Sequence, residues 1–350
     1  MTREELVAFV QSGEPAMKMD LAGVDLSGAN LSGAIFEQVR FTGANLSGVN
    51  FRESVLIQCD LTGANLANAT MQMAVIKDCC FADASLENVY LGAGKLASCD
   101  LQRANLTGAN LELTAMHAVD LRGARLVRCT MDRTAIIDAV LGYTDFTGTL
   151  VQKVTMLKVD MSTSIIAGTR FDQVLMANSS FGGRDLSGLR AAYCVFMECD
   201  FTGCDLHGAD LTQTNFKGAK LHSAILDGVQ CERGLFVEAI LTQATLKGAN
   251  LRQAIFEGAN LEGADFTGAD LYQCTMNDVR AAGAILRDTE LTYTDLSRAD
   301  LTAADLTGAT MFRARIHRVI SAGTQWPVTR ATALGDDPDL ARSELWRKTH

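Results

Sequence analysis

The feature that most constrains this chain is a ladder of large apolar residues that recurs every five positions. The ladder runs from Leu21 to Ile316 without an insertion or a deletion, which gives sixty positions. Fifty-seven of them hold Leu, Ile, Val, Met or Phe, and the exceptions are Ala191, Cys231 and Ala281. A step of five matches neither the period of an α-helix nor the two-residue alternation of a flat strand. The ladder therefore predicts a short extended segment and a turn, repeated along most of the chain.

A second ladder, made of small residues, lies two positions before the first. It includes Ala29, Ala34, Ala44 and Cys59. Asp or Asn usually precedes the large residue, and Gly often follows it by two positions, so that the unit reads A(D/N)LxG. Asn, Asp and Gly supply the turn chemistry that such a repeat needs. All three prolines lie outside the repeat, as expected because proline removes a backbone donor from a strand ladder.

The repeated unit, as in GANLSG and GADFTGADL, resembles the pentapeptide-repeat family over residues 19–318. The resemblance implies an all-β fold, a right-handed quadrilateral parallel β-helix with four pentapeptides in each coil. It also implies that the large and small ladder residues point inward and that the other three positions point outward. Sixty units make about 15 coils, and residues twenty apart stack in one column. We call the side that carries Phe36 and every twentieth residue after it the fourth side; the ladder residues of the first, second and third sides begin at positions 21, 26 and 31.

The ends of the ladder divide the chain into three parts. Residues 1–18 are expected to form an N-terminal helical cap, because an open end of a stacked repeat exposes its core and its unpaired backbone. Residues 19–318 are the β-helix, and residues 319–350 are a C-terminal tail that is part helical. Asp337 is the expected N-cap of a tail helix that extends to Trp346. The tail either caps its own last coil or docks on another chain.

The repeat is irregular at about 181–195. Arg184 and Leu189 take the place of small inward residues, and Ala191 takes the place of a large one. Because a charged side chain cannot lie unpaired in so narrow a core, the local coil is expected to distort and release Arg184. We therefore predict a bulge or a bend at this point. The alternative is an irregularity that the fold tolerates without consequence.

No group of residues indicates an enzyme, a metal site or a cofactor. Eight of the ten cysteines occupy small inward positions, where cysteine behaves as a small apolar residue. Cys59, Cys79 and Cys99 are twenty apart, so they line up in one direction and do not converge on a metal ion. Four of the five histidines, His207 and His317 among them, follow a ladder residue and are expected on the surface. We therefore expect a protein that is not an enzyme and that has no cofactor and no metal.

Charge and composition disfavour several kinds of partner. The net charge of −10 and the pI of about 5.0 disfavour binding to nucleic acid or to anionic membranes. No stretch approaches the ~18 apolar residues of a membrane span, and the start of the chain lacks a signal-peptide pattern. Ten cysteines in such a chain are typical of a reducing compartment. We expect a cytoplasmic protein with no membrane partner and no direct nucleic-acid partner.

The acidic residues support a rival hypothesis. Asp20, Asp60 and Asp100 share one outward column, and the family resemblance includes proteins that mimic duplex DNA and bind topoisomerases. The acidic sides would then bind and inhibit a type II topoisomerase such as gyrase. Against this, Asp or Asn is simply the consensus at this position, and Arg40 and Arg280 interrupt the column. A second rival is an accessory role in a bacterial type VI-like secretion or effector system, whose repeat proteins the short helical lead-in resembles.

One outward column departs from the consensus. On the fourth side, the position before the ladder residue holds apolar residues such as Ile35 where Asp or Asn is expected, and the position after it adds others. Both positions that flank an inward residue of an extended segment face outward, so these residues predict an apolar strip larger than a monomer usually exposes. The residues expected to carry binding are Val55, Ile57, Val75, Ile137, Leu157, Leu175, Val195, Met197, Leu235 and Val237.

The strip predicts a protein-interaction scaffold. It would bind a protein partner, or a second copy of the chain in a homodimer, through the apolar side of a rigid β-helix. The alternative is that Val and Ile merely stabilise an exposed strand face through their β propensity.

Overall fold

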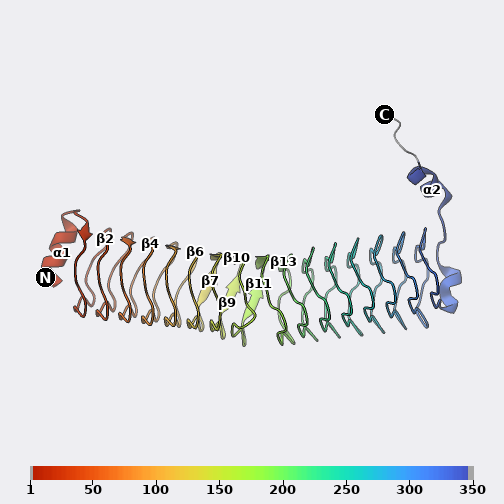
Figure 1. The fold of residues 1–350 in the computed structure, drawn as a ribbon, viewed down its shortest axis with the longest axis horizontal. Coiled ribbons are helices and arrows are strands. Elements are labelled where there is room, and N and C mark those ends of the chain that lie inside the picture. The colour runs from red at the N-terminus through yellow and green to blue at the C-terminus, as the bar shows by residue number, and fades with distance from the viewer. Residues whose placement is uncertain (1–2, 346–350) are drawn as a thin grey trace. The chain divides into compact units, whose positions relative to one another are not determined.

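The computed structural model describes residues 3–345. Within this part the chain divides into two compact units, residues 3–180 and residues 181–345, and each unit contains a stack of coils (Figure 1). In both units the paired residues are parallel and twenty apart, as Asp25 is with Asn45 and Asp185 with Asp205. Because pairs recur at every fifth residue around each coil, the predicted four-sided parallel β-helix is confirmed.

The first unit begins with α1 (Arg3–Gln11), the expected N-terminal helix. Leu6 and Val10 lie four residues apart, so they share one face of the helix, and both are buried. The helix ends where the N–H of Gly13 donates to the carbonyl of Val10 at 3.0 Å. The strand β1 (Ala16–Met17) follows at once and pairs with β2, which starts the stack of coils directly behind the helix.

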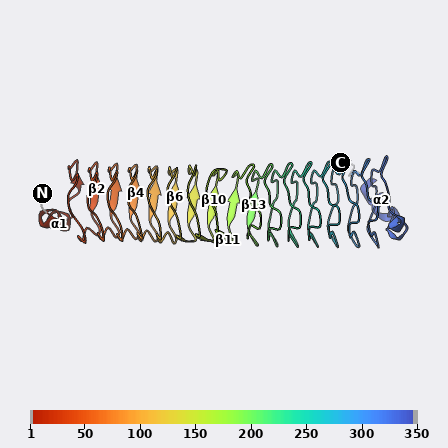
Figure 2. The ribbon, with the colours of Figure 1, turned by 90° about the horizontal axis from the view of Figure 1, so that it is seen from below.

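Regular strands form mainly on the fourth side of the first unit. Nine of them pair in the order β1-β2-β3-β4-β5-β6-β8-β10-β12, and Figure 2 shows β2, β4, β6 and β10 side by side. After β1 their bounds are Ile35–Glu37 (β2), Val55–Ile57 (β3), Val75–Lys77 (β4), Lys95–Ala97 (β5), Ala115–His117 (β6), Ala135–Ile137 (β8), Thr155–Leu157 (β10) and Leu175–Ala177 (β12). On the third side a smaller sheet has the order β11-β9-β7, with bounds Arg170–Asp172, Leu150–Gln152 and Thr130–Asp132.

Regular strands therefore mark about nine turns, fewer than the 15 coils that the ladder predicts. The other coils of the described chain pair through single bridges rather than through three-residue strands. The twenty-residue register is the same in both kinds of coil. The difference thus lies in local backbone geometry and leaves the period of the repeat unchanged.

The corners between sides follow from the residue two places after each ladder residue. At a typical corner the carbonyl of Leu26 accepts the N–H of Ala29 at 2.9 Å, and Gly28 between them has a φ of +64°. Glycine adopts this left-handed conformation without steric cost. At the corner after β3 the same place is held by Gln58, with a φ of +52°, and the N–H of Cys59 donates to a cysteine sulfur of the next coil.

The two ladders fill the core of each unit. Of the sixty large ladder residues, all are buried except Ile166 and Ile316, which are half-buried. The residues at small inward positions are buried as well, apart from the half-buried Met19, Val24 and Arg184. Where they carry a hydroxyl, it finds a backbone partner. For example, Thr134 donates its Oγ1 hydrogen to the carbonyl of Leu111 at 2.7 Å. The predicted inward direction of both ladders is confirmed.

The fourth side of the second unit is filled by phenylalanine rings. Phe216 and Phe236 stack nearly parallel with centroids 5.2 Å apart, and Phe236 and Phe256 stack at 4.7 Å. Among the described residues of this unit only β13 (Val195–Met197) is a regular strand. The remaining coils of the unit are held by single bridges and by their packed core.

The tail of the second unit is part helical, as predicted. It contains a 3₁₀ helix, η1 (Val328–Thr332), and an α-helix, α2 (Pro338–Leu345). Asp337 caps α2, because its Oδ1 accepts the N–H of Leu340 at 3.1 Å. Trp346, the expected last residue of this helix, lies outside the described residues.

The helix α2 contacts the last coils of its own unit. Glu344 pairs through Oε1 with Arg298 at 3.0 Å and through Oε2 with Arg318 at 2.6 Å. Its Oε2 also lies 3.4 Å from Nε2 of His317, whose Nδ1 accepts the N–H of Asp337 at 3.1 Å. His317 is buried. The expectation that it lies on the surface is wrong, because the tail covers it.

Candidate protein-binding surface

The strands of the fourth side present two outward residues beside each buried ladder residue. In β3, Leu56 is buried, while Val55 and Ile57 on either side of it are half-buried. Parallel pairing places Val55 between Ile35 and Val75, at the ~4.8 Å spacing of neighbouring strands. The side chains of the predicted column therefore lie next to one another in the first unit.

Ile35, Val55, Ile57 and Val75 form a first apolar cluster. Ile35 and Val75 each expose 41% of their surface. All four side chains lie on consecutive strands, β2 to β4, so the cluster is continuous across three coils. This is the most compact part of the predicted strip.

Ile137, Leu157 and Leu175 form a second apolar cluster on β8, β10 and β12. Ile137 lies beside Leu157, and Leu175 lies beside Thr155, in the parallel register. Leu175 exposes 37% of its surface, and the other two are half-buried. Thr155 and Leu157 flank the same ladder residue of β10, so Thr155, with its methyl group, lies between Leu157 and Leu175.

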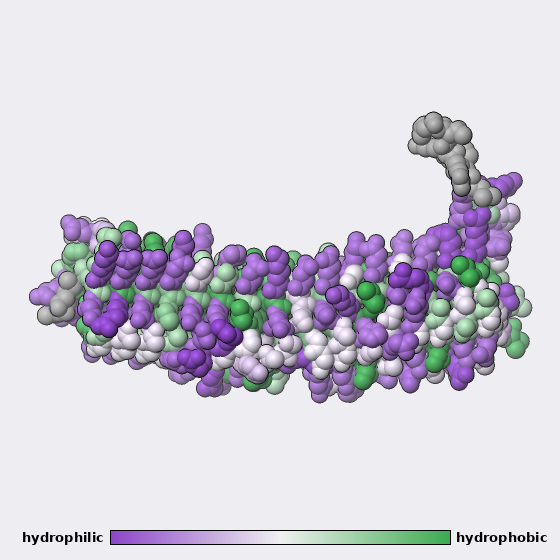
Figure 3. Space-filling view, in the orientation of Figure 1, coloured by the Kyte–Doolittle hydropathy of each residue, from purple (hydrophilic) through white to green (hydrophobic). Residues whose placement is uncertain are grey.

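Charged and polar residues separate the two clusters. Lys77 follows Ile57 in the register, and Lys95 follows Val75. His117 stands beside Ile137, with its Nε2 3.6 Å from Oδ2 of Asp138. The predicted strip is therefore two separate clusters in the first unit. The face in Figure 3 also shows hydrophobic patches among hydrophilic side chains.

The second unit holds the remaining residues of the predicted strip. Val195, Met197, Leu235 and Val237 are all half-buried. Each pair flanks a buried phenylalanine, and Asn215 lies between Val195 and Leu235 in the parallel register. Leu235 also lies beside Ile255, which is half-buried. The second unit therefore exposes apolar patches on this side, but none as large as the first cluster of the first unit.

The three irregular inward residues keep the register of the second unit. The carbonyl of Arg184 accepts the N–H of Asp205 at 2.8 Å, and Leu189 and Ala191 are buried. Arg184 is half-buried, and this burial lowers the pKa of its guanidinium. The side chain thus remains partly in contact with solvent, while a bulge or bend at this point stays a prediction.

The acidic columns have a structural role. Oδ1 of Asp60 accepts the N–H of Thr62 at 3.0 Å, and Asp25 binds the N–H two positions on in the same way, at 2.9 Å. Such Asx turns support the corner that follows the carboxylate. The Arg40 guanidinium also pairs with Asp20 in the neighbouring coil. The consensus Asp or Asn is therefore explained by the turn that it stabilises.

A cluster of aromatic and arginine residues that the sequence patterns did not predict lies on the third side of the second unit. The rings of Tyr272 and Tyr293, and those of Tyr293 and Phe312, meet edge to face with centroids 5.9 Å apart. Arg252 lies 4.2 Å from the centroid of the Tyr272 ring, and Arg313 lies 5.8 Å from that of Tyr293. We call these five residues the aromatic–arginine cluster. The signal was present, because Arg252, Tyr272 and Phe312 share one column of twenties.

A comparison with protein families agrees with this architecture. The family model described as pentapeptide repeats matches residues 20–56, 44–83, 84–117, 194–230, 239–278 and 279–318, more than half of the chain. The chain belongs to the pentapeptide repeat family. The matches leave out residues 118–193 of this pentapeptide repeat protein, where strands occupy the third side as well as the fourth. No curated protein matches the chain.

Solved structures that resemble this pentapeptide repeat protein include three named proteins. A trypsin-treated form of QnrB1, described as a plasmid-mediated fluoroquinolone resistance protein, is 18% identical over 57% of this chain and 91% of its own, with a TM-score of 0.34. HetL, from Nostoc sp. strain PCC 7120, is described as involved in heterocyst differentiation regulation. It is 21% identical over 85% of this chain and 97% of its own, with a TM-score of 0.17. Rfr23, from Cyanothece 51142, is 19% identical over 45% of this chain and 91% of its own, with a TM-score of 0.14. Similarity at these scores carries no inference about function.

Three other kinds of feature, a reactive thiol, a metal site and a membrane-spanning helix, are tested by the described residues of this pentapeptide repeat protein. Burial raises the pKa of Cys99 to about 11 and that of Cys274 to about 12, so both thiols stay protonated at neutral pH. Within residues 3–345 no group of three or more His, Cys, Asp or Glu could hold a metal ion. In the same range no helix combines the length and the apolar character that crossing a bilayer requires.

Proposed function

We propose that this pentapeptide repeat protein is a non-enzymatic scaffold that binds a protein through the apolar clusters of its fourth side. The observation that supports the proposal most strongly is the column Ile35, Val55 and Val75, where apolar side chains replace the turn-forming Asp or Asn of other sides. An apolar side chain has no oxygen that could accept the backbone N–H two positions on, so it cannot form the Asx turn. Its exposure is unfavourable in water, and a partner that covers it gains free energy.

The strands give this surface its rigidity. In β3 and β10 the outward residues of the clusters have a parallel strand on either side, so little conformational entropy is lost when a partner binds. Burial would contribute about 25 cal/mol for each Å² of apolar surface, before the costs of association. A second copy of the chain, as a lateral homodimer, or a different protein would fit the clusters equally well. A cytoplasmic location, which suits ten reduced cysteines, is part of the same proposal.

Paired aspartate substitutions test the two clusters separately. Val55→Asp with Val75→Asp places charges in the first cluster, and Leu157→Asp with Leu175→Asp places them in the second. Burying an unpaired carboxylate in an interface is costly. We therefore expect each pair of substitutions to raise the dissociation constant of the homodimer, or of the complex with a partner protein, by at least about tenfold. The mass in solution or the yield of cross-links should fall accordingly. Sedimentation velocity and cross-linking with mass spectrometry measure the two quantities.

Leu113→Asp is the matched control for these variants. Leu113 exposes 48% of its surface but lies outside the fourth side. We expect this variant to keep the association of the wild type, and circular dichroism to show the same fold for all variants. An unchanged solution mass together with unchanged cross-links in both paired variants would show that the clusters are not an interface.

The acidic columns are the observation behind the alternative, a DNA mimic that inhibits gyrase. Partial burial opposes ionisation of Asp200, but hydrogen bonds from Thr202 outweigh it and lower the pKa of the carboxyl. The column therefore stays charged at neutral pH. A gyrase supercoiling assay tests the alternative, and the absence of inhibition at micromolar concentrations of the protein would exclude it.

A further inference from the structure

The aromatic–arginine cluster of the second unit exposes large rings where the repeat does not require them. Tyr293 exposes 42% of its surface and Phe312 exposes 49%. Both stand at outward positions on the third side, one or two places after a buried ladder residue, and neither contributes to the core. Exposed Tyr and Arg residues that pack against one another are the residue types enriched at the centres of protein interfaces.

The two arginines of the cluster differ in their charge balance. Arg252 stacks on Tyr272 and donates through Nη1 to Oδ2 of Asp270 at 2.9 Å. Arg313 lies over Tyr293, and it forms no ion pair with any residue between 3 and 345. A guanidinium that lies over a ring keeps its N–H groups free at its edge, so it can still bind a carboxylate in a bidentate manner. Arg313 is therefore the guanidinium available to a ligand.

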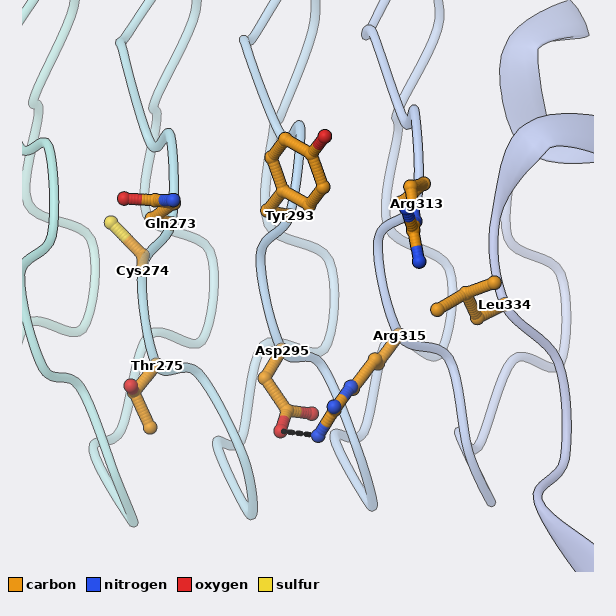
Figure 4. A pocket seen from close by; sticks show the side chains of 8 residues that line it. All are labelled: Gln273, Cys274, Thr275, Tyr293, Asp295, Arg313, Arg315 and Leu334. Carbon is orange, nitrogen blue, oxygen red and sulfur yellow. Dashed lines mark ion pairs between the residues drawn. The ribbon is translucent and has the colours of Figure 1, made fainter.

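A second arginine faces the same space. An open pocket of about 370 Å³ lies beside the cluster, and Figure 4 shows Tyr293 and Arg313 on one rim and Asp295 and Arg315 on the other. Arg315 is 3.8 Å from Asp295, whose Oδ1 already accepts the backbone N–H of Ser297 at 2.9 Å. The pocket therefore combines two guanidinium groups with one carboxylate that is engaged in a turn.

The remaining wall of the pocket is mixed, because Gln273 and Thr275 are polar and Leu334 is apolar. Leu334 closes it on the side of the tail and exposes 43% of its surface. The pocket thus offers a ring, an aliphatic side chain and two cations within one space. This combination fits a ligand that carries a carboxylate close to an apolar side chain.

We propose that this surface binds an extended acidic segment of a partner protein. A carboxylate of the segment lies between Arg313 and Arg315, and a neighbouring apolar side chain packs against Tyr293 and Leu334. A single strand of nucleic acid fits less well, because Asp270 and Asp295 would repel successive phosphates along its backbone. A peptide can place one carboxylate between the two arginines and keep uncharged residues beside Asp270 and Asp295. The site uses none of the apolar clusters, so it goes beyond the function proposed above.

Fluorescence anisotropy with a defined probe tests the proposal on the full chain. The probe is an eight-residue, fluorescein-labelled peptide with one Asp, a Leu two positions to either side of it and Ser elsewhere, because residues two apart share one face of an extended segment. The comparison peptide replaces the Asp by Asn. We expect saturable binding of the acidic peptide and at least about tenfold weaker binding of the neutral one, because hydrogen bonds to charged groups contribute more than neutral ones. Equal binding of the two peptides, or none, would overturn the proposal.

Substitutions locate the binding on the molecule. We expect Arg313→Gln with Arg315→Gln, and separately Tyr293→Ala, to weaken binding by about tenfold. Arg233→Gln is the matched control, because Arg233 is exposed in the same column as Tyr293 but donates to Gln253 and contacts no ring. Unchanged affinity in the two test variants would overturn the proposal, and all these surface positions can be checked for folding by circular dichroism.

Three further measurements distinguish peptide binding at this site from binding elsewhere on the molecule or by a different ligand. The Leu157→Asp with Leu175→Asp variant should bind the peptide as the wild type does, so a failed apolar interface would leave this proposal standing. Tighter binding of an oligothymidine than of the acidic peptide would assign the surface to nucleic acid instead. A tenfold gain in peptide affinity on removal of residues 346–350 would show that the chain's own tail is the occupant, and either result would overturn the proposal.

Discussion

The fourth side is built differently in the two units, although both keep the same twenty-residue register. In the first unit its inward residues include Leu56 and Ile136, which lie at the centres of regular strands. In the second unit Phe216, Phe236 and Phe256 fill the same place, and their coils pair through single bridges. The repeat therefore fixes which residues pair, while the local backbone differs from one coil to another.

This difference also decides what the surface displays. A strand presents both residues that flank the ladder residue, so the first unit gathers Ile35, Val55 and Val75 into one continuous cluster. In the second unit Asn215 lies between Val195 and Leu235 in the register and interrupts the apolar residues. The largest apolar cluster accordingly belongs to the first unit.

The largest expected effect comes from removing a ring of the second unit. We expect Phe236→Ala to lower the free energy of unfolding by about 3–5 kcal/mol, through lost burial and the cavity that remains. Ile136→Ala, the matched change in the first unit, should cost about 1 kcal/mol less, because no ring contacts are lost with it. Urea unfolding measures both variants. Equal losses would show that the stacked rings add nothing beyond their volume.

Tyr143→Ala serves as the control for these two substitutions. Tyr143 exposes 72% of its surface, so its loss should change the free energy of unfolding by no more than about 0.5 kcal/mol. Hydrogen exchange measured by mass spectrometry would show in which unit each variant loses protection. Loss of protection in the first unit after Phe236→Ala would contradict a core effect that is local to the second.

A smaller effect is expected from the corner residues of the fourth side. Gly258 has a φ of +67°, and a Cβ there would lie 3.8 Å from the Glu238 side chain, which is an ordinary contact. The cost of Gly258→Ala is therefore that of the backbone conformation alone, about 1 kcal/mol. Gln58→Gly, at a φ of +52°, should change stability by less than about 0.5 kcal/mol, because relief of strain is offset by the greater freedom of glycine in the unfolded chain.

Differential scanning calorimetry of both variants measures this contrast. An unchanged Tm for Gly258→Ala would mean that the corner residue does not distinguish the two kinds of coil. A large gain for Gln58→Gly would mean that the strand-bearing coils of the first unit store strain at their corners.

Much of this architecture follows from the sequence alone. The step of five sets which residues are inward, and the twenty-residue column by itself places Val55 beside Val75. Gly13 marks the end of the first helix, and Asp337 marks the start of the last, because helix ends depend on local chemistry. These features are fixed by contacts between residues close in the repeat.

The features that escaped prediction depend on other contacts. His317 occupies an outward position of the repeat, yet the tail covers it, and the repeat carries no information about where a tail folds. Lys77 and Lys95 divide the apolar strip, and each can be seen in its own column of residues twenty apart. Whether the surface is continuous depends on two columns together, the one before the ladder residue and the one after it. The aromatic–arginine cluster joins two neighbouring columns. One column alone shows Arg252, Tyr272 and Phe312, but their contacts with Tyr293 and Arg313 require both columns to be read together.

The smallest expected effect concerns the first side, which is alike in the two units. Partial burial opposes ionisation of Asp60, but hydrogen bonds from Thr62 outweigh it and lower its pKa. Hydrogen bonds from Thr302 lower the pKa of Asp300 in the second unit. A carboxyl whose pKa is lowered on folding contributes stability that is complete above its ordinary value of about 4 and is lost as the pH falls through the lowered value.

Asparagine separates this charge effect from the turn. Asn45 shows that an amide oxygen can accept the same N–H two positions on, at 3.3 Å, so Asp60→Asn and Asp300→Asn should each change stability at pH 7 by about 0.5 kcal/mol or less. Below about pH 4 both variants should lose less stability than the wild type does. Urea midpoints measured from pH 7 to pH 2 test this, and we expect the two variants to behave alike. A clear difference between the pH dependence of the two variants would show that the two units also differ on their first sides. Core packing on the fourth side alone would then not explain the difference between the units.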